Sequence, residues 1–391
     1  MYKINKMKSH IVLGLGFGDE GKGSMTNYLA SKLEKPIVIR FSGGQQAGHT
    51  VVKDDIRHIF SSFGSGTLSN VPSYFSEHTT IYLSNILTER NVLREKGINP
   101  KLFVHPLAIM TTPYDVAYNR LSDGSKGSSC GLGIGTTMIR HTTSGYKLFA
   151  IDTINKKILK QKLEGIKKYY EKLCAHNGIR HFQDEYEKYE GLFYEAMDQK
   201  LFEIEEYDFL CLYENLIFEG SQGIMLDMNH GFFPDVTFAN TTSKNALEIS
   251  QKLDVDIEDI ETYYVTRTYQ TRHGRGWLSN DNKIELINNE KETNILNEYQ
   301  GDFKVCELDY DLLNYAIEID KIYNKSHSNL VVTCLDQRPD FKFDYLQIKM
   351  GGYNIYNSSS DSEIKLMGRI NPIAMDFDKI YSIYAEIFDI K

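Results

Sequence analysis

Cysteine is scarce in this sequence, and the cysteine spacings that bind metals are missing. Only five cysteines occur among 391 residues, and none form a Cys-x-x-Cys pair. An odd, scattered set is typical of free thiols in a reducing compartment, and it predicts no zinc site. Long apolar runs are missing too. The polar, lysine-rich residues 1–10 precede only a short apolar run at 11–13, which predicts neither a signal peptide nor a membrane span. We therefore expect a cytoplasmic protein with no membrane partner.

Positive charge is also in deficit. Lysine and arginine number 44 against 53 acidic residues, so the formal net charge is −9. Proteins that bind nucleic acids broadly carry a basic surface that neutralises phosphates, so we expect no nucleic-acid partner. A nucleotide ligand remains compatible with this charge, because it needs only a local group of cations.

The amino-terminal third predicts an α/β fold with a parallel sheet. Residues 10–14 form a short apolar run that ends in glycine, residues 24–33 have apolar positions at helical spacing, and residues 36–40 form a second apolar run. Strand, glycine turn, helix and strand in this order make a βαβ unit. Similar patterns predict strands at 80–83, 216–218, 262–266 and 330–333 and a helix at 85–96, whereas residues 352–363 are typical of a polar surface loop.

The middle of the chain has a different character. Residues 154–215 are dense in lysine, glutamate and tyrosine, with apolar residues three or four apart and no strand signal. We interpret this segment as a helical insertion, and the chain as one domain over 1–391 with that insertion at about 154–215.

A glycine-rich turn between the first predicted strand and helix is the clearest candidate site. Residues 14–23 read Gly-Leu-Gly-Phe-Gly-Asp-Glu-Gly-Lys-Gly. Glycines let backbone N–H groups turn toward an anion, the helix N-terminus adds its positive end, and Lys22 can reach phosphates as a point charge. An acid beside a phosphate is repulsive unless a metal or a proton mediates, so Asp19 is interpreted as a Mg²⁺ ligand or a general base.

A second candidate loop follows the second predicted strand. Residues 42–50 read Ser-Gly-Gly-Gln-Gln-Ala-Gly-His-Thr. Ligands in open α/β sheets bind at the carboxyl ends of strands, and this loop leaves such an end beside the first one. We therefore predict a catalytic role for His49.

These two loops together resemble the amino-terminal signature of adenylosuccinate synthetases, Gly-Asp-Glu-Gly-Lys-Gly followed by Gly-Gly-x-Asn-Ala-Gly-His-Thr. Residues 218–237, with Asn240-Thr-Thr242 after them, are similar to a third block of that family, 265–276 to a fourth and 333–336 to a degenerate fifth. The matches occur in family order. The resemblance implies a mostly parallel central sheet flanked by helices, related to phosphate-loop nucleoside triphosphatases, and a homodimer with a shared active site.

The resemblance also implies an activity. Family members join aspartate to the 6-position of IMP through 6-phosphoryl-IMP, using Mg²⁺ and the γ-phosphate of GTP. By this likeness Asp19 takes the N1 proton and binds Mg²⁺ with the carbonyl of Gly48, and His49 donates to the transferring phosphoryl group. Deprotonating N1 makes the 6-oxygen a nucleophile, and the phosphate charge needs donors and a cation. The other residues expected at the nucleotides are Gly18, Glu20, Gly21, Gly23, Gln46, Ser128, Ser129, Arg140, Gln222, Thr237 and Asp336.

Two of these expectations are specific. Arg140 is expected to reach the nucleotide of the partner subunit, although its spacing from the preceding motif is shorter than in the family. Asp336 is expected to pair with N1 and N2 of guanine, two donors that adenine lacks. The family's Thr-Lys-x-Asp lysine is Cys334 here, and no Ser-x-Gly-Pro motif follows, so the choice between GTP and ATP stays open.

The largest departure from the family lies at 297–309. The family has an arginine-rich loop there, whose guanidinium groups clamp the carboxylates of aspartate. The two arginine positions are Gly301 and Phe303 in this chain, and only Lys304 is basic. Losing two such clamps costs several kcal/mol of binding. Either another segment supplies the charge, with Arg267, Arg272 and Arg275 as candidates, or the amino donor is not aspartate.

Three interpretations therefore remain open from the sequence. The first is a GTP- and Mg²⁺-dependent ligase that acts on IMP and aspartate. The second is a variant ligase with another 6-oxopurine, such as GMP or dGMP, or another amine. Asp19 argues against the guanylate version, because relatives with that substrate replace this acid. The third is a nucleotide-binding paralogue without catalysis.

Overall fold

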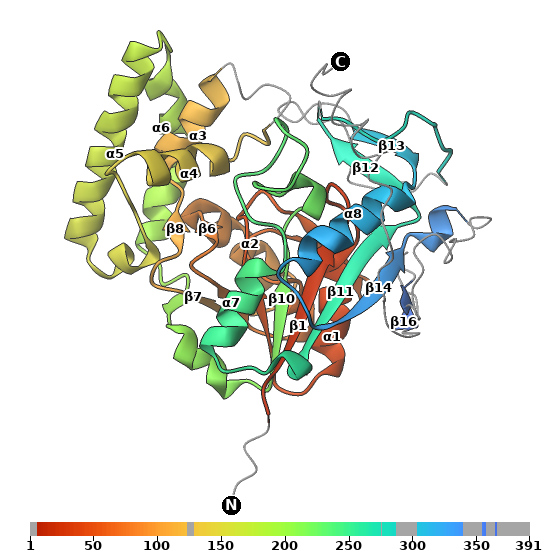
Figure 1. Ribbon diagram of the computed structural model, residues 1–391. Coiled ribbons are helices and arrows are strands. Elements are labelled where there is room, and N and C mark those ends of the chain that lie inside the picture. The colour runs from red at the N-terminus through yellow and green to blue at the C-terminus, as the bar shows by residue number, and fades with distance from the viewer. Residues whose placement is uncertain are drawn as a thin grey trace, which may run out of the picture.

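A ten-stranded sheet forms the centre of the computed structural model, which describes residues 6–122, 129–274, 276–286, 303–338, 354–356 and 364–365 (Figure 1). Every pairing in it is parallel except the one between the last two strands. The predicted α/β class with a mostly parallel sheet is confirmed. In sheet order the strands are β16 (Ile364–Lys365), β15 (Asn354–Tyr356), β14 (His327–Thr333), β11 (Ile260–Arg267), β1 (Lys8–Gly14), β10 (Asn215–Glu219), β2 (Pro36–Arg40), β5 (Ser73–Phe75), β7 (Leu102–Val104) and β9 (Glu203–Ile204).

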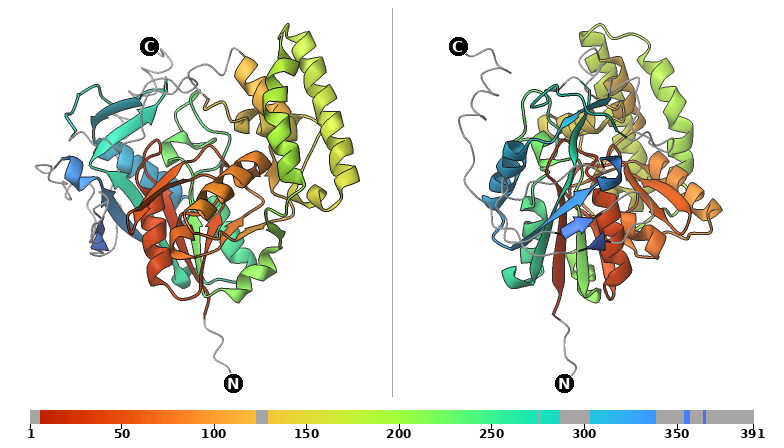
Figure 2. Two further views of the ribbon diagram at one scale, coloured as in Figure 1. Left: turned by 180° about the vertical axis from the view of Figure 1, so that it is seen from behind. Right: turned by 90° about the vertical axis from the view of Figure 1, so that its right-hand side faces the viewer.

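Helices cover both faces of this sheet, which explains why its central strands are continuous apolar runs. On β1, Ile11 and Leu13 belong to the cluster that includes α7 (Lys244–Lys252) and α8 (Tyr310–Lys321). The residue between them, Val12, packs with Met25 and Leu29 of α1 (Lys22–Lys32) on the opposite face. Figure 2 shows α7 and α8 on one side of the strands and α1 on the other.

A helical lobe packs beside the strands at one end of the sheet, at the upper left of Figure 1. It contains α3 (Pro113–Leu121), α4 (Ile134–Thr143), α5 (Lys156–His176) and α6 (Phe182–Met197). Together with α2 (Leu83–Glu95), the helices α3, α5 and α6 contribute to a second hydrophobic cluster. Two long helices thus lie inside the predicted insertion.

Three strand predictions need correction. Residues 154–215 are not free of strand, because β9 pairs with β7 at the sheet edge. The strand expected at 80–83 is β6 (Thr80–Ile81), which pairs with β8 (Ile109–Met110) outside the main sheet. The polar stretch at 352–363 contains β15, which pairs with β14. Strands of two or three residues carry no alternation pattern, so pairing partners decide them.

The remaining elements are two antiparallel hairpins and several short turns of 3-10 helix. One hairpin joins β3 (His49–Lys53) to β4 (Ile56–Phe60), and the other pairs β12 (Tyr269–His273) with β13 (Phe303–Glu307). Within the described ranges no helix combines the length and apolarity needed to span a bilayer. The 3-10 turns are η1 (Ser65–Ser69), η3 (Ala150–Ile154), η4 (Tyr207–Leu212), η5 (Ile224–Leu226), η6 (Ile257–Asp259) and η7 (Leu335–Gln337).

The parallel arrangement gathers the candidate loops at one edge. The strands β11, β1, β10 and β2 are consecutive neighbours and run in the same direction. Their carboxyl ends therefore lie together, and the loops that leave them begin at residues 15, 41, 220 and 268. Ligands of open α/β sheets bind at such an edge.

Candidate active site

The phosphate loop joins β1 to α1 through backbone conformations that favour glycine. Gly18 and Gly21 have φ angles of 105° and 96°, and Gly21 is the N-cap of α1. Asp19 lies between them with φ 64°, in the left-handed region that aspartate tolerates better than most residues. The strand–turn–helix context predicted for a phosphate cradle is therefore present.

Lys22, expected as a catalytic residue, and Glu20, expected to bind nucleotide, form an ion pair inside this loop. The backbone amides of Gly16 and Gly18 donate to Oε1 of Glu20 at 3.0 and 2.8 Å, and Nζ of Lys22 lies 2.6 Å from Oε2. Both side chains are almost fully buried. The loop amides and Lys22 thus hold an anion, which here is the carboxylate of Glu20. A bound triphosphate would compete with Glu20 for these donors.

His49, the first residue of β3, directs Nδ1 at the carboxylate of Glu219 at the end of β10. The two atoms are 2.6 Å apart. Glu219 is completely buried and also accepts hydrogen bonds from the amide of Ser65, at 3.1 Å, and from the Ser65 hydroxyl, while Nη1 of Arg40 lies 3.9 Å away. The carboxylate accepts a hydrogen bond from the protonated Nδ1, so Nε2 is the ring atom left for a ligand.

The protonation of this pair follows from burial and from the neighbouring charges. Burial raises the pKa of Glu219, but His49, Arg40 and Ser65 together lower it more and hold it at about 2. Burial also lowers the pKa of His49 below its ordinary value, although Glu219 opposes this. The resting pair is therefore a carboxylate and a neutral imidazole with its proton on Nδ1.

Asp19 faces the hairpin of β12 and β13. Its Oδ2 lies 3.0 Å from Nε2 of His273, and Nε of Arg267 donates to its backbone carbonyl. Burial would raise the pKa of Asp19, but the hydrogen bond from His273 and the charges of Arg267, His273 and Lys22 outweigh burial, so the pKa lies below its ordinary value. One quarter of the side chain is exposed, so an ionised carboxylate is accessible to a ligand.

Gln46 carries an unsatisfied amide at the same edge. Both of its side-chain polar atoms, Oε1 and Nε2, are buried without a hydrogen-bond partner in the described part of the chain. A buried polar group left in this state costs about 1–3 kcal/mol. A ligand that offers both a donor and an acceptor would remove this cost, and a 6-oxopurine ring or a protonated phosphate has both.

The loop after β10 closes on the other two loops. The hydroxyls of Ser42 and Ser221 are 2.8 Å apart, which joins the loops that follow β2 and β10. Gln222 has φ 56° and packs against Gly18, since its Oε1 is 3.9 Å from the position that a Cβ on Gly18 would occupy. The amide of Met225 donates to the carbonyl of Gly16 at 3.1 Å. The structure therefore brings Gln222 to the phosphate loop.

Arg140 lies in the interior of the helical lobe, and its expected contact with the nucleotide of a partner subunit stays a prediction. Its guanidinium is completely buried and binds Asp115 at 2.8 and 3.0 Å, with further hydrogen bonds to the carbonyls of Met110 and Tyr146. Tyr170 donates to the same Asp115 at 2.7 Å. These contacts satisfy the guanidinium inside the helical lobe.

Ser129 and Thr237 take part in local hydrogen bonds. The hydroxyl of Ser129 donates to Oδ1 of Asn119 at 3.0 Å, and the amide of Thr237 donates to the carbonyl of Leu226 at 2.8 Å. Ser128, Arg275, Gly301 and the side chain of Asp336 lie outside the described residues.

The basic residues expected to bind the amino donor lie on or beside the second hairpin, and each is engaged with backbone carbonyls. Arg267 donates to Asp19, and Lys304 donates to Gly276 at 2.9 Å. Arg272 donates to the carbonyls of Trp277 and Asp235, both at 2.8 Å, and burial lowers its pKa to about 10.

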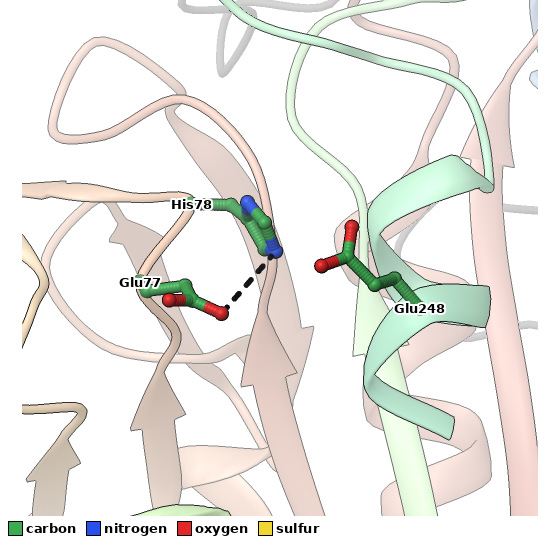
Figure 3. Close-up of side chains that lie close together, drawn as sticks. All are labelled: Glu77, His78 and Glu248. Carbon is green, nitrogen blue, oxygen red and sulfur yellow. Dashed lines mark ion pairs between the residues drawn. The ribbon is translucent and has the colours of Figure 1, made fainter. Parts of the chain in front are cut away.

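In the described part of the chain, the candidates for metal binding are the oxygen donors expected from the sequence and one cluster of side chains. The carboxylate of Asp19 and the carbonyl of the exposed Gly48 are hard oxygen donors, which suit Mg²⁺. Glu77, His78 and Glu248 form the cluster, with ligand atoms within 4.8 Å of one another (Figure 3). The ammonium of Lys252 lies 2.7 Å from Glu77 and 3.3 Å from Glu248 and already neutralises these carboxylates, so we assign no metal there.

Sequence reasoning missed the partners of the two central residues. Glu219 lies in the block at 218–237, and a charged residue that ends a buried strand is a usable signal. His273 lies in the block at 265–276, but its spacing to other histidines does not suit a metal. No local pattern shows that it contacts Asp19.

The fold and this site define an α/β protein with a phosphate loop at the carboxyl edge of a parallel sheet. The model of the adenylosuccinate synthetase family matches residues 11–377. The chain is 28% identical to the adenylosuccinate synthetase of Mesoplasma florum, over 70% of this chain and 65% of that protein. It is 32% identical to that of Clostridium perfringens, over 61% and 57%. The chain belongs to the adenylosuccinate synthetase family, and it spans less than two thirds of the length of these relatives.

Two solved structures share the fold. A fully ligated adenylosuccinate synthetase from Plasmodium falciparum matches with a TM-score of 0.63 at 20% identity, over 84% of this chain and 77% of that one. A cyanophage S-2L succinoaminodeoxyadenylate synthetase bound to dGMP and dATP matches with a TM-score of 0.61 at 14% identity, over 97% and 99%.

Proposed function

We propose that this protein is a GTP- and Mg²⁺-dependent ligase that phosphorylates the 6-oxygen of IMP, or of a similar 6-oxopurine nucleotide, and replaces it with an amine. With aspartate as the donor the product is adenylosuccinate. The observation that carries the proposal is the convergence of Asp19, the His49–Glu219 pair and the unsatisfied amide of Gln46 at one edge of the sheet.

These residues suit the two proton requirements of the reaction. The ionised Asp19 takes the N1 proton, which turns the 6-oxygen into a nucleophile toward the γ-phosphorus. His49 presents Nε2 to the transferring phosphoryl group, whose charge adds to that of Glu219 and favours a proton on this nitrogen. Lys22 leaves the carboxylate of Glu20 and binds the phosphates of the leaving diphosphate instead. The bond between the γ-phosphorus and the bridging oxygen breaks, and the released nucleoside diphosphate keeps its electrons.

The other ligands are assigned by the same reasoning. Asp19 and the carbonyl of Gly48 would hold Mg²⁺, which supplies positive charge to the phosphates when bound. Gln46 and Gln222 would bind the purine nucleotide, together with the loop residues Gly18, Gly21 and Gly23. Asp336 would select guanine in the triphosphate. We further propose that the protein acts as a homodimer in the cytoplasm.

The test is release of phosphate from GTP with IMP and aspartate, followed by detection of the succinylated nucleotide by mass spectrometry. We expect turnover that requires all three substrates, and none when Asp19 is replaced by asparagine. Asp55→Asn is a matched control, because Asp55 is an exposed aspartate with nearly the same backbone conformation, φ 63° against 64°. Tight nucleotide binding without turnover on any 6-oxopurine would show that the protein is a silent paralogue.

A different amino donor is the second candidate. Phe303 stands where the family has an arginine, and its ring lies 4.9 Å from that of His273. Phosphate release that requires IMP but is indifferent to aspartate, and that rises with another amine, would favour this candidate over the first.

A further inference from the structure

Asp19 depends on the second hairpin for its position. The carboxylate belongs to a turn with positive φ angles at residues 18, 19 and 21, which no regular secondary structure stabilises. In the described part of the chain, its only side-chain partner is His273, at 3.0 Å from Oδ2. No described residue donates a hydrogen bond to Oδ1.

His273 is itself held in a defined orientation. It is the last residue of β12 and lies directly across the hairpin from Phe303, the first residue of β13. The two rings are 4.9 Å apart at an angle of 43°, a separation at which aromatic pairs stabilise each other. This ring contact restricts the imidazole plane, so Nε2 stays directed at Asp19.

The same segment supports the backbone of the loop. The hydroxyl of Thr271 donates to the carbonyl of Gly18 at 3.4 Å, and Nε of Arg267 donates to the carbonyl of Asp19. Thr271 and His273 are two apart on β12, so their side chains lie on one face of the strand. The consecutive strands β11 and β12 thus hold the backbone of this turn and the carboxylate of Asp19.

We propose that His273 is a positioning residue for Asp19: its Nε2–H binds Oδ2, so that Oδ1 remains the acceptor for the N1 proton of the purine nucleotide. The inference rests on the proposed function. A proton acceptor that rotates away from the reacting atom loses rate without losing substrate affinity, because the base acts only in the chemical step.

Two substitutions separate the hydrogen bond from the packing. His273→Phe keeps an aromatic ring against Phe303 but removes the donor, whereas His273→Gln keeps an N–H at a position close to that of Nε2. We expect kcat of the Phe variant to fall by about 10- to 100-fold, the range for partners that orient a reactive ligand. KM for the purine nucleotide should stay near its wild-type value, and the Gln variant should recover much of the rate.

A wild-type kcat in the Phe variant would overturn the proposal, and so would an equal loss in both variants or a change confined to KM. Imidazole ¹⁵N NMR supplies a readout that does not depend on turnover. We expect His273 to carry a proton on Nε2, with a resonance that moves in the Asp19→Asn variant. A proton on Nδ1 alone, or a resonance that Asp19→Asn leaves unchanged, would rule out the pair. If the wild type converts no purine nucleotide, the proposed function fails and the NMR result decides this inference separately.

Discussion

Replacing Glu219 by glutamine is the sharpest perturbation that the structure offers. The carboxylate accepts hydrogen bonds from Nδ1 of His49 and from the amide and hydroxyl of Ser65, and it is the nearest counter-charge of Arg40. An amide has nearly the same shape, but its nitrogen must donate. At least one of the surrounding N–H groups then faces another donor, or His49 turns to its other tautomer.

The expected loss can be estimated from these contacts. A hydrogen bond to a charged group contributes about 1.5–3 kcal/mol, and a buried cation left without its partner costs about 3–5 kcal/mol. Part of the cost of the unpaired cation appears as a lower free energy of unfolding, because Arg40 is buried in the wild type and stays buried in the variant. For the rate, a histidine in the wrong tautomer loses up to about 10⁴-fold in a serine protease, which sets an upper bound here.

Turnover and stability should therefore both be measured for Glu219→Gln. The assay is steady-state phosphate release with IMP and GTP varied separately, together with thermal unfolding. We expect a fall in kcat of about 10²–10⁴-fold, with a smaller change in KM for either nucleotide. Glu258→Gln is a suitable control because this glutamate is exposed on η6, away from the site.

A Glu219→Gln variant that is less stable but turns over at the wild-type rate would contradict this prediction, since Glu219 would then support only the fold. A large rise in KM with kcat unchanged would also refute it, because that result places Glu219 in nucleotide binding and not in the orientation of His49.

Three further predictions follow from other contacts. Arg140→Met leaves Asp115 buried without its cation, so we expect a loss of about 3–5 kcal/mol in the free energy of unfolding, measured in urea, and little change for the exposed Arg180→Met. If Arg140→Met abolishes turnover at full stability, the arginine belongs to the active site after all. Removal of Mg²⁺ by a chelator should stop turnover, and added Mg²⁺ should restore it. Activity without the metal would show that Asp19 and Gly48 do not act as Mg²⁺ ligands. The pKa of Glu219 is about 2 in the folded protein against an ordinary 4.5, so its ionised form stabilises the fold above about pH 4.5, and this stability is lost as the pH falls toward 2. Acid unfolding of Glu219→Gln should depend less on pH over this interval, and an identical pH dependence would contradict the assignment.

Several features were predictable from short stretches of sequence because their causes are local. Residues 14–23 predict a phosphate loop, because the backbone at positions 18 and 21 has positive φ angles that favour glycine. This preference does not depend on the tertiary contacts around the loop. The strands β1 and β2 were recognised from apolar runs, because burial on both faces of a parallel sheet demands such runs. Elements of two or three residues, such as β9, could not be predicted, since a pairing partner alone decides them.

The α/β class, the family and the loops that carry Asp19, Lys22 and His49 were predictable from the sequence. The partners of these three residues became known only from the three-dimensional fold. His49 and Glu219 are 170 residues apart, and Arg267 lies 248 residues from the carbonyl that it binds. Arg140 is a second example of a position that the sequence does not reveal. Its charge is suited to a nucleotide, but the side chain lies in the core and pairs with Asp115. The spacing of residues along the chain does not predict such contacts, because they form when strands distant in sequence become neighbours in the sheet.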